Sequence, residues 1–488
     1  MPDIKEIINL MATGVRKEDQ ELINKAYKFA EKAHGGQKRM SGDPYFTHVY
    51  ETAKTLAELG MDPQTIAAGF LHDVLEDTEI TEKEIEKEFG KEILFLINGV
   101  TKLGTVRYRG YQRHVESLRK FFMAMTDDIR VVIIKLADRL HNLRTLDAVR
   151  EDKRLRIAME SINVYAPLAN RLGIGKLKSE IEDAAFPYIH PVEFAEMEEI
   201  IKEKKDLYEK NLEEVKESIE KELAKNKIKI SRITYRMKHK YSLWKKLMKR
   251  DMDIDKVYDV VAMRVIVKNI EDCYRVLGII HSIWKPLPGR IKDYVAVPKP
   301  NGYRSIHTTI FTGSGGTAEI QIRTEEMHND AVYGIAAHFF YKEAKRGQKF
   351  EYNDNFKWIE DLKNLNYNPE DPKTFLEHLK VDFFSDRIFI FTPKGDVIDL
   401  PEDSTPIDFA YSIHSDVGDH ISGVRINGKM SPIFTKLKNR DIVDIIKKND
   451  AHPSNKWLEH VKTVVAKKHI KSYLEKNTLL SKLKSIGK

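Results

Sequence analysis

The segment FLHDVLEDTEI, residues 70–80, places metal-ligand and acid–base side chains among large apolar ones. His72 and Asp73 are adjacent, and Glu76 and Asp77 follow one helical turn later. On a helix, residues four positions apart are neighbours on one face. The spacing therefore predicts that these polar side chains line a pocket with apolar walls.

Two other segments supply side chains of the same kind. His48 lies upstream in PYFTHV, and Asp138 lies downstream in DRLHNLRT, beside the apolar run VVIIKLA. With His72 and Asp73 they would give mixed imidazole and carboxylate ligation, which suits manganese, iron or zinc. The two carboxylates one turn later would then handle the proton of a metal-bound water. The residues alone leave one alternative open, which is a set of core histidines satisfied by hydrogen bonds.

A second set of polar groups lies on short β-branched runs in the middle of the chain. Asp259 lies in VYDVVAMRVI and Glu319 in AEIQIRT, and carboxylates inside such runs are costly unless they bind something. If the two converge, they would hold Mg²⁺, which prefers carboxylate oxygens together with substrate phosphates. Nearby cations would neutralise a polyphosphate; they are Arg236, Lys238, Lys246, Arg264, Lys292 and Lys299.

The charge distribution supports phosphate binding in the same region. Residues 231–250 contain eight cations and no acid, which indicates a surface for a nucleotide or a nucleic acid. A solvated helix face is the alternative. The P-loop pattern is absent, because GIGKLKS at 173–179 has the wrong spacing. The run GSGGT at 313–317 falls between two expected strands and is interpreted as a hairpin turn.

Length and composition limit the class of protein. The chain has 488 residues, of which 41% are hydrophobic and 32% charged, as expected for a soluble globular protein of three or four domains. Cys273 is the single cysteine, which excludes intrachain disulfides and zinc clusters built on several cysteines. Neither an apolar run of about 18 residues nor a secretory signal is visible. We therefore expect a cytoplasmic protein without membrane contact.

The elements that must position these residues change along the chain. Apolar spacing predicts that residues 1–190 are almost entirely helical, and that 191–227 form a charged, solvated helical connector. Residues 228–350 are predicted to be a mixed α/β domain, with β-type runs from Tyr258, Tyr294, Arg304 and Ala318 and helical patterns at 236–250, 271–285 and 325–345.

The last part of the chain is predicted to be a smaller module. A linker over 351–381 leads to a β-rich module over 382–448. This module opens with a hairpin around Pro393-Lys394-Gly395. A basic helical tail then fills 449–488.

The order H…HD…D resembles the HD phosphohydrolase superfamily, which cleaves phosphoester bonds at a divalent metal. The words HGGQKRMSGDPYFTHV, HDVLEDT, NGVTKL and DRLHNLRT narrow the resemblance to the all-helical hydrolase domain of the RelA/SpoT homologue family, whose members make and destroy (p)ppGpp. The resemblance implies Mn²⁺ ligands at His48, His72, Asp73 and Asp138, and catalytic carboxylates at Glu76 and Asp77. It implies substrate contacts at Arg39, Ser41, Tyr45, Asn142 and Thr145.

The words RMKHKYSLWKKL, YDVVAMRVIV, GRIKDYVAVPKPNGYRSIHTT and AEIQIRTEEMH resemble the family's nucleotidyltransferase-like synthetase domain. That domain transfers pyrophosphate from ATP to the 3′-hydroxyl of GDP or GTP. The resemblance implies that Asp259 holds Mg²⁺, that Glu319 aligns or activates the 3′-hydroxyl and shares the metal, and that Tyr303 stacks on the guanine. It places Arg236 and Arg264 beside the adenine. Contacts to phosphates or to the acceptor would come from Lys238, Ser242, Lys246, Lys292, Lys299, Asn301 and His307.

The word RIKD at 290–293 has the basic form that accompanies bifunctional family members. We therefore expect one enzyme with two opposed reactions, coupled through helices between about residues 150 and 230. A hydrolase with a silent synthetase domain used for sensing is one alternative. A regulator that binds the ribosome or tRNA is the other.

The segment from Arg387 to Lys429 resembles a TGS domain, a small β-grasp-like module. In long family members this module contacts the acceptor end of uncharged tRNA on the ribosome, and His414 matches the tRNA-facing histidine. A structural cap with an exposed histidine is the alternative for this module. The expected fold class is thus multidomain α and α+β, with an all-helical domain, a mixed α/β nucleotidyltransferase-like domain and a small β-grasp-like domain.

Overall fold

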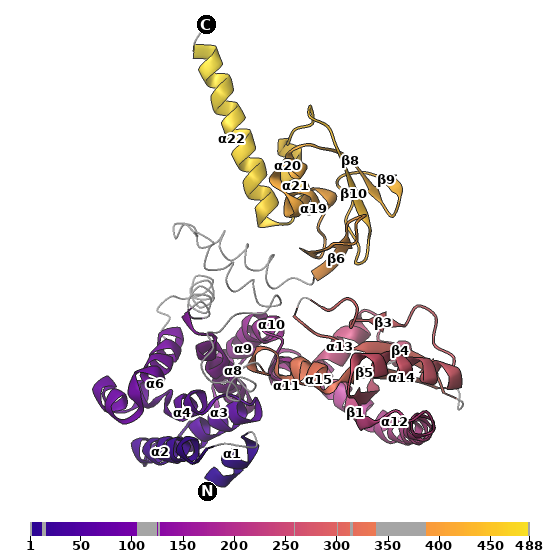
Figure 1. Ribbon diagram of the computed structural model, residues 1–488. Helices are drawn as coiled ribbons and strands as arrows, with labels where there is room; N and C mark the ends of the chain where they lie inside the picture. Colours follow the sequence, from indigo (N-terminus) through magenta and orange to yellow (C-terminus); the bar gives the residue numbers. More distant parts are fainter. Residues whose placement is uncertain are drawn as a thin grey trace. The chain divides into compact units, whose positions relative to one another are not determined.

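The computed structural model describes residues 2–11, 16–104, 124, 127–257, 259–299, 301–312, 316–337 and 387–486. The chain divides into two compact units, Met1–Asn366 and Tyr367–Lys488, shown in Figure 1. None of the helices in the described ranges combines the length and the apolar character of a membrane span.

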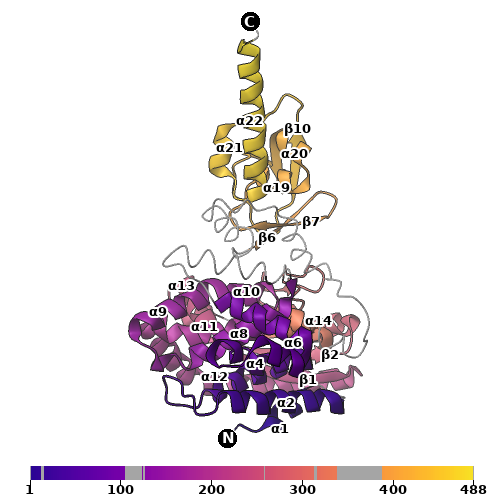
Figure 2. The same cartoon turned by 90° about the vertical axis from the view of Figure 1, so that its left-hand side faces the viewer.

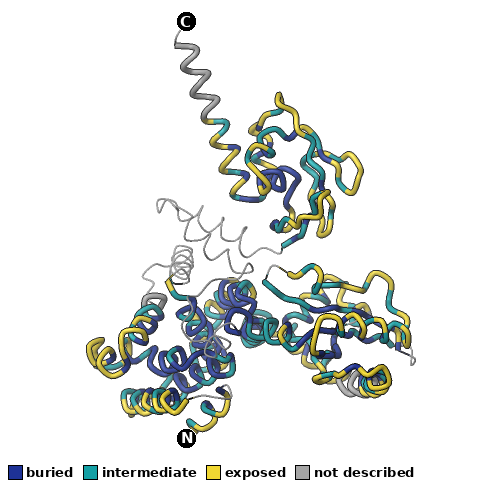
Figure 3. The backbone as a smooth tube through the Cα atoms, in the orientation of Figure 1, coloured by how far each residue is buried: buried dark blue, intermediate teal, exposed yellow. Residues whose placement is uncertain are grey.

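The first unit begins with a helical region in which α3, α4 and α8 form the buried centre, drawn in dark blue in Figure 3. The prediction of an almost entirely helical region is confirmed for the described residues. Its helices are α1 (Ile4–Leu10), α2 (Lys17–Ala33), α3 (Phe46–Glu58), α4 (Pro63–Leu71), α5 (Val74–Asp77), α6 (Glu82–Gly104), α8 (Ile129–Arg144), α9 (Glu151–Glu160), α10 (Ala166–Arg171) and α11 (Gly175–Ile189), with a 3₁₀ turn η1 (Leu146–Ala148) and a π-helical turn η2 (Ser161–Tyr165).

The helix that leads to the HD motif has clear start and stop signals. The carboxylate of Asp62 accepts a hydrogen bond from the Thr65 backbone N–H, and Pro63 occupies the first turn, as is usual at a helix N-terminus. However, α4 ends at Leu71 and α5 begins at Val74. The helix expected for the pairs His72/Glu76 and Asp73/Asp77 is therefore interrupted after Leu71, although the Asp77 N–H still bonds to the Asp73 carbonyl at the start of α5. His72 and Asp73 occupy the break between two helices.

The middle of the first unit is built on a mixed five-stranded sheet with the strand order β1-β2-β5-β4-β3. Strands β2 and β5 are parallel and the other neighbours are antiparallel, which confirms the mixed α/β prediction. The elements are β1 (Ile230–Met237), β2 (Val261–Val267), β3 (Lys292–Asp293), β4 (Ile306–Phe311), β5 (Thr317–Thr324), α13 (Lys240–Met248), α14 (Ile270–Ile283), α15 (Glu325–Tyr333) and the 3₁₀ turn η3 (Ile254–Lys256).

Two local expectations for this region are wrong. The helical pattern at 236–250 begins as strand β1, and α13 starts only at Lys240. The expected β-run at 294–298 forms a turn instead, because the Asp293 carboxylate accepts hydrogen bonds from the backbone N–H groups of Val295 and Ala296. The Gly-rich segment at 313–315 and residues 338–345 lie outside the described residues.

The expectation that residues 191–227 form a solvated connector is wrong for one face of helix α12 (Pro191–Lys225), because that face is buried. Met197, Leu212, Val215, Ile219 and Leu223 are buried in the same hydrophobic core as the apolar face of the sheet. These residues recur at the three- and four-residue spacing of one helical face. The helix is therefore part of the α/β core as well as a connection.

The second unit contains the predicted hairpin, in which β6 (Arg387–Phe391) pairs with β7 (Val397–Pro401). A three-stranded sheet follows in the order β10-β8-β9. Its remaining elements are α19 (Pro406–Ile413), α20 (Ser415–Asp419), β8 (Ile421–Ile426), β9 (Lys429–Ser431), β10 (Val443–Lys447), α21 (Asn455–His460) and α22 (Val464–Ile486).

The C-terminal helices pack on this module rather than forming a separate tail. Figure 2 shows the start of α22 beside α19 and α21. Trp457, Ala466 and Ile470 join Ile407 and Tyr411 in one buried cluster. The second unit therefore has a core of its own.

Candidate active sites

The residues of the HD motif converge from three separate places in the helical region. His48 lies on α3, His72 and Asp73 lie at the break after α4, and Asp138 lies on α8. Ligand atoms of His48, His72 and Asp138 all lie within 4.8 Å of one another. The Asp73 carboxylate lies 3.4 Å from His48 Nε2 and 3.3 Å from His72 Nε2.

The hydrogen bonds of His72 leave one ring nitrogen facing the carboxylates. Its Nδ1 lies 2.8 Å from the Gly69 carbonyl, so Nδ1 carries the proton and donates it. Its Nε2 is buried without a hydrogen-bond partner, and burial lowers the pKa of His72. A lone pair that faces Asp73 and Asp138 is unfavourable unless a cation lies between them. The donor set therefore fits a divalent metal.

His48 is oriented by a neighbour that the motif does not include. His48 Nδ1 lies 2.8 Å from His141 Nδ1, and Arg39 Nη1 lies 3.0 Å from the same atom. Because a guanidinium only donates, His141 Nδ1 accepts and His48 Nδ1–H donates. This leaves His48 Nε2 directed at the Asp138 carboxylate, 3.2 Å away. Burial also lowers the pKa of His141 to about 3, so its ring remains neutral.

Asp138 is ionised despite its burial. Burial acts to raise the pKa of Asp138, but Lys135 and the two histidines hold it well below its usual range. Lys135 Nζ lies 2.6 Å from one carboxylate oxygen, and the Asn142 amide donates to the other at 2.5 Å. In the sequence Lys135 is only an interruption of an apolar run. The structure makes it the counter-charge of a metal-ligand position.

The carboxylates predicted to act on a proton lie at the rim of this cluster. Burial and the Asp73 charge raise the pKa of Glu76. The Tyr45 hydroxyl lies 2.8 Å from an Asp73 oxygen and 2.6 Å from an Asp77 oxygen, so it links a ligand position to the second carboxylate.

The predicted substrate contacts differ in how closely they approach this cluster. Arg39 donates to the Asn142 side chain at 2.5 Å, which ties both residues to the ligand set. The Ser41 hydroxyl instead bonds to Asp43, and the Thr145 hydroxyl bonds to the His141 carbonyl. These two hydroxyls are thus engaged locally.

The second site is a cavity of about 390 Å³ over one face of the five-stranded sheet. Its lining includes every predicted synthetase residue except Arg264: Arg236, Lys238, Ser242, Lys246, Asp259, Lys292, Lys299, Asn301, Tyr303, His307 and Glu319. The pairing of residues between neighbouring strands brings several of these side chains together. Glu319 on β5 pairs with Ala262 on β2, just after Asp259, and Gln321 pairs with His307 on β4.

The two carboxylate oxygens of Asp259 have different surroundings: Oδ2 forms ion pairs with two lysines, whereas Oδ1 accepts no hydrogen bond. Lys238 Nζ and Lys246 Nζ lie 2.6 and 2.5 Å from Oδ2. Burial acts to raise the pKa of Asp259, but the two ammonium groups lower it to about 2. The other oxygen, Oδ1, is buried without a hydrogen-bond partner. An ionised carboxylate with a free oxygen in a polar cavity fits a bound Mg²⁺.

Glu319 lies at the end of a chain of hydrogen bonds across the cavity. The Tyr303 hydroxyl lies 2.8 Å from His307 Nε2, and His307 Nδ1 lies 3.2 Å from a Glu319 oxygen. The Gln321 amide donates to the same oxygen at 3.0 Å. Gln321 was not predicted, although its place two residues after Glu319 puts it on the same face of the strand.

Arg264 lies further along the same sheet face, outside the lining of the cavity. It lies on β2 opposite Gln321 on β5. Burial and the neighbouring charge of Arg323 lower the pKa of Arg264 to about 9. Arg236, its predicted partner beside the adenine, does line the cavity.

In the second unit, His414 caps a short helix. Its Nδ1 accepts a hydrogen bond from the Asp416 backbone N–H at 3.1 Å, and its side chain is exposed. Both features agree with a structural cap that presents a histidine to solvent.

The class that these features define is a multidomain protein, with an HD-type cluster of histidines and carboxylates, an α/β domain with a cavity lined by cations, and a TGS-like module. Models of known families match in the same order: an HD domain at residues 26–175, a region found in RelA / SpoT proteins at 235–346, and a TGS domain at 388–447.

Curated relatives agree with this assignment. A GTP pyrophosphokinase from Myxococcus xanthus is 44% identical over 461 residues, covering 94% of this chain and 61% of the relative. A guanosine-3′,5′-bis(diphosphate) 3′-pyrophosphohydrolase from Aquifex aeolicus is also 44% identical, covering 93% of this chain and 65% of the relative. Among solved structures, the small alarmone synthetase 2 from Bacillus subtilis is 27% identical, covers 33% of this chain and 88% of its own, and has a TM-score of 0.25.

The three matches and the two relatives show that this chain is similar to proteins of the RelA/SpoT family along most of its length. It spans less than two thirds of the length of the two curated relatives. The HD domain, together with the buried His48, His72 and Asp138 cluster, supports the use of a divalent metal.

Proposed function

We propose that this chain is a bifunctional enzyme that makes (p)ppGpp from ATP and GDP or GTP and hydrolyses it again. The observation that carries the proposal is the presence of two separate sites in one unit. Each site has an ionised carboxylate and a buried ligand atom without a hydrogen-bond partner, His72 Nε2 in one and Asp259 Oδ1 in the other. The names of the two relatives, one for each reaction, agree with this proposal.

In the hydrolase reaction, water attacks the 3′-linked phosphorus, the bond to the ribose oxygen breaks, and pyrophosphate leaves. A divalent cation held by His48, His72, Asp73 and Asp138 would supply Lewis acidity at the phosphate. Glu76, whose pKa is raised, is suited to take a proton from the attacking water and to pass it to the leaving 3′-oxygen of the ribose. Arg39, tied to Asn142, would orient the substrate.

In the synthetase reaction, the 3′-hydroxyl of GDP or GTP attacks the β-phosphorus of ATP, and AMP leaves. Glu319 would accept the proton of the hydroxyl, because His307 and Gln321 hold its carboxylate in place and ionised. Lys238 and Lys246 would neutralise the phosphate chain, and Asp259 would hold a divalent cation that offsets more of its negative charge. Tyr303 would stack on the guanine.

The two sites should prefer different metals. Imidazole and carboxylate ligands at the hydrolase site suit Mn²⁺. The carboxylate-only set at the synthetase site, completed by substrate phosphates, suits Mg²⁺. We also propose that the TGS domain contacts the acceptor end of uncharged tRNA through the exposed His414.

Paired assays on the purified chain test the two-site proposal. One holds ATP, GDP and Mg²⁺, and the other holds ppGpp and Mn²⁺. Asp73→Asn should abolish hydrolysis and retain synthesis, whereas Glu319→Gln should do the reverse. Loss of both reactions in either variant would contradict separate sites. Hydrolysis without synthesis in the wild type would favour a silent synthetase domain.

A further inference from the structure

One wall of the nucleotide cavity comes from outside the α/β domain. The segment around the start of α11 contributes Asn170, Gly173, Gly175, Lys178 and Ser179 to the lining. These residues belong to the helical region that also carries the metal site. The domain match for the synthetase, residues 235–346, does not include them.

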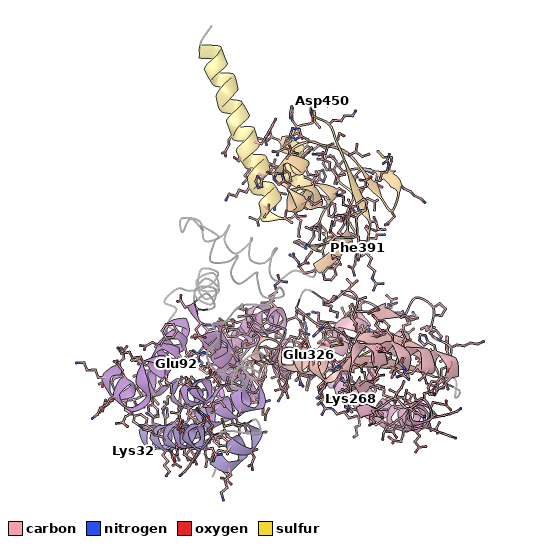
Figure 4. All side chains as sticks on the ribbon, in the orientation of Figure 1. Lys32, Glu92, Lys268, Glu326, Phe391 and Asp450 are labelled. Atoms are coloured by element: carbon pink, nitrogen blue, oxygen red, sulfur yellow. The ribbon has the colours of Figure 1, made fainter. Side chains whose placement is uncertain are left out.

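Close backbone contacts hold this wall in place. The Ile335 backbone N–H donates to the Leu172 carbonyl at 3.0 Å, and the Asn301 amide donates to the Asn170 carbonyl at 3.3 Å. A Cβ atom on Gly173 would lie 3.0 Å from the Asn301 carbonyl oxygen. The segment GIGKLKS does not have the P-loop spacing. It instead forms a contact between the helical region and the α/β domain, and Gly173 allows the two backbones to approach closely. In Figure 4 Glu326 marks α15 at this junction of helices and sheet.

Lys178 is the cation on this wall. Its Nζ lies 2.5 Å from an oxygen of Glu182, a buried carboxylate one turn later on α11. The Ser242 hydroxyl of α13 donates to the same oxygen at 3.4 Å. One turn beyond Ser242, Lys246 pairs with Asp259. Lys178 thus lies on the α13 side of the cavity.

An ammonium group has three N–H donors, and Glu182 accepts one of them. The others are available to an anion in the cavity. Lys238 and Lys246 already lie on the α13 side of the cavity. Lys178 adds a third cation there, which is more positive charge than the Glu182 carboxylate alone balances and which suits a chain of several phosphates.

We propose that Lys178 binds the phosphate chain of the nucleoside triphosphate donor, so that the helical region completes the synthetase site. This inference rests on the proposed function. Glu182 and Ser242 act as positioning residues that fix the ammonium group. The synthetase pocket is then formed jointly by two domains of the first unit.

Lys176 provides a matched control on the same helix. Its Nζ also lies 2.5 Å from a glutamate, Glu58 of α3, and its side chain is 30% exposed against 25% for Lys178. Because Lys176 and Lys178 are two positions apart on α11, their side chains point to different sides of the helix. Lys176 does not belong to the cavity lining.

The experiment measures binding by titration calorimetry on the full chain in Mg²⁺, with α,β-methylene-ATP and with GDP as separate probes. Lys178→Met should weaken binding of the ATP analogue about tenfold, the scale of one charge-assisted contact, and leave GDP binding within about twofold. Lys178→Arg should retain most of the affinity, and Lys176→Met should change neither constant.

Two results would overturn the inference: wild-type affinity for the ATP analogue in Lys178→Met, or a loss confined to GDP, which would put the residue at the acceptor. If the wild type binds neither probe, the proposed function fails as well. Thermal unfolding monitored by circular dichroism establishes that each variant is folded before titration.

Discussion

At the scale of single residues, burial disfavours the charged form at both sites, and the neighbouring charges decide whether a group stays ionised. In the candidate hydrolase site, the buried Asp138 carboxylate stays ionised because Lys135 and two histidines surround it. In the synthetase cavity, crowded cations have lowered pKa values. Lys299 shows this most clearly: burial and the neighbouring Lys292 and Lys238 lower its pKa to about 8. Its ammonium group lies 4.8 Å from the Tyr294 ring centroid and 5.0 Å from that of Tyr303.

This pKa predicts a pH dependence for synthesis. The protonated form of Lys299 is the one that binds phosphate, and in the free enzyme it is lost as pH rises through about 8. We therefore expect kcat/KM for ATP and GDP to fall above this pH, because that ratio reports groups of the free enzyme. Bound phosphate favours the charged form, so kcat should fall only at higher pH.

The measurement is a pH profile of initial synthesis rates at low and saturating nucleotide. Lys299→Arg, which stays charged throughout this range, should shift the fall in kcat/KM to higher pH. A wild-type profile that stays flat through this range would show that Lys299 does not titrate as described.

At the scale of elements, the arrangement depends on a few places where backbone segments approach closely. Gly334 follows α15 with a φ of 54°. A Cβ atom there would lie 2.3 Å from the Leu172 carbonyl oxygen and 2.3 Å from the Gly173 carbonyl carbon. This glycine allows α15 to meet the segment before α11, on which the nucleotide cavity depends.

We expect Gly334→Ala to destabilise the first unit by about 2 kcal/mol or more, since it combines left-handed backbone strain with overpacking. Synthesis should fall as the cavity wall moves. Urea unfolding measures the stability and the paired assay measures the activity.

Gly278→Ala is the matched control. Gly278 lies inside α14, and a Cβ atom there would meet nothing within 4 Å. Alanine in a helix should therefore stabilise by about 0.5–1 kcal/mol. Equal stability of the Gly334→Ala and wild-type chains would mean that the two segments separate without cost.

At the scale of the whole molecule, both candidate sites lie in the first unit and the TGS-like module lies in the second. The second unit is held together by its own buried acid. Asp408 on α19 is 1% exposed. It accepts hydrogen bonds from the Thr405, Lys462 and Thr463 backbone N–H groups and from two threonine hydroxyls. This carboxylate joins α19 to the segment that leads into α22.

Asp408→Asn should therefore destabilise the second unit by about 3 kcal/mol, because an amide accepts through only one oxygen and leaves buried donors unpaired. Both reactions of the first unit should persist at moderate temperature. Differential scanning calorimetry and the paired assays together measure the two effects.

Asp444→Asn is the surface control for this prediction. Asp444 lies on β10, is 46% exposed and lies 3.5 Å from Arg425, so its loss should cost less than about 1 kcal/mol. Loss of both reactions in Asp408→Asn at low temperature would show that the catalytic unit depends on the second one.

Much of the chemistry is evident from the sequence itself. The types and order of His48, His72, Asp73 and Asp138, the acids Asp259 beside a strand and Glu319 on one, and the hairpin around Gly395 all follow from local patterns. They do so because ligand type, strand alternation and turn residues are properties of short segments. The helical, α/β and β-rich succession of elements follows for the same reason.

Only the tertiary structure decided which distant groups act on these residues. His141 lies 93 positions from the His48 ring that it orients, and Lys178 lies 60 or more positions from the α13 residues beside it. The break at His72, the buried face of α12 and the place of Arg264 outside the cavity also depend on packing. Contacts between residues far apart in the chain leave no periodic or local signal, so they exist only once the core has brought those segments together.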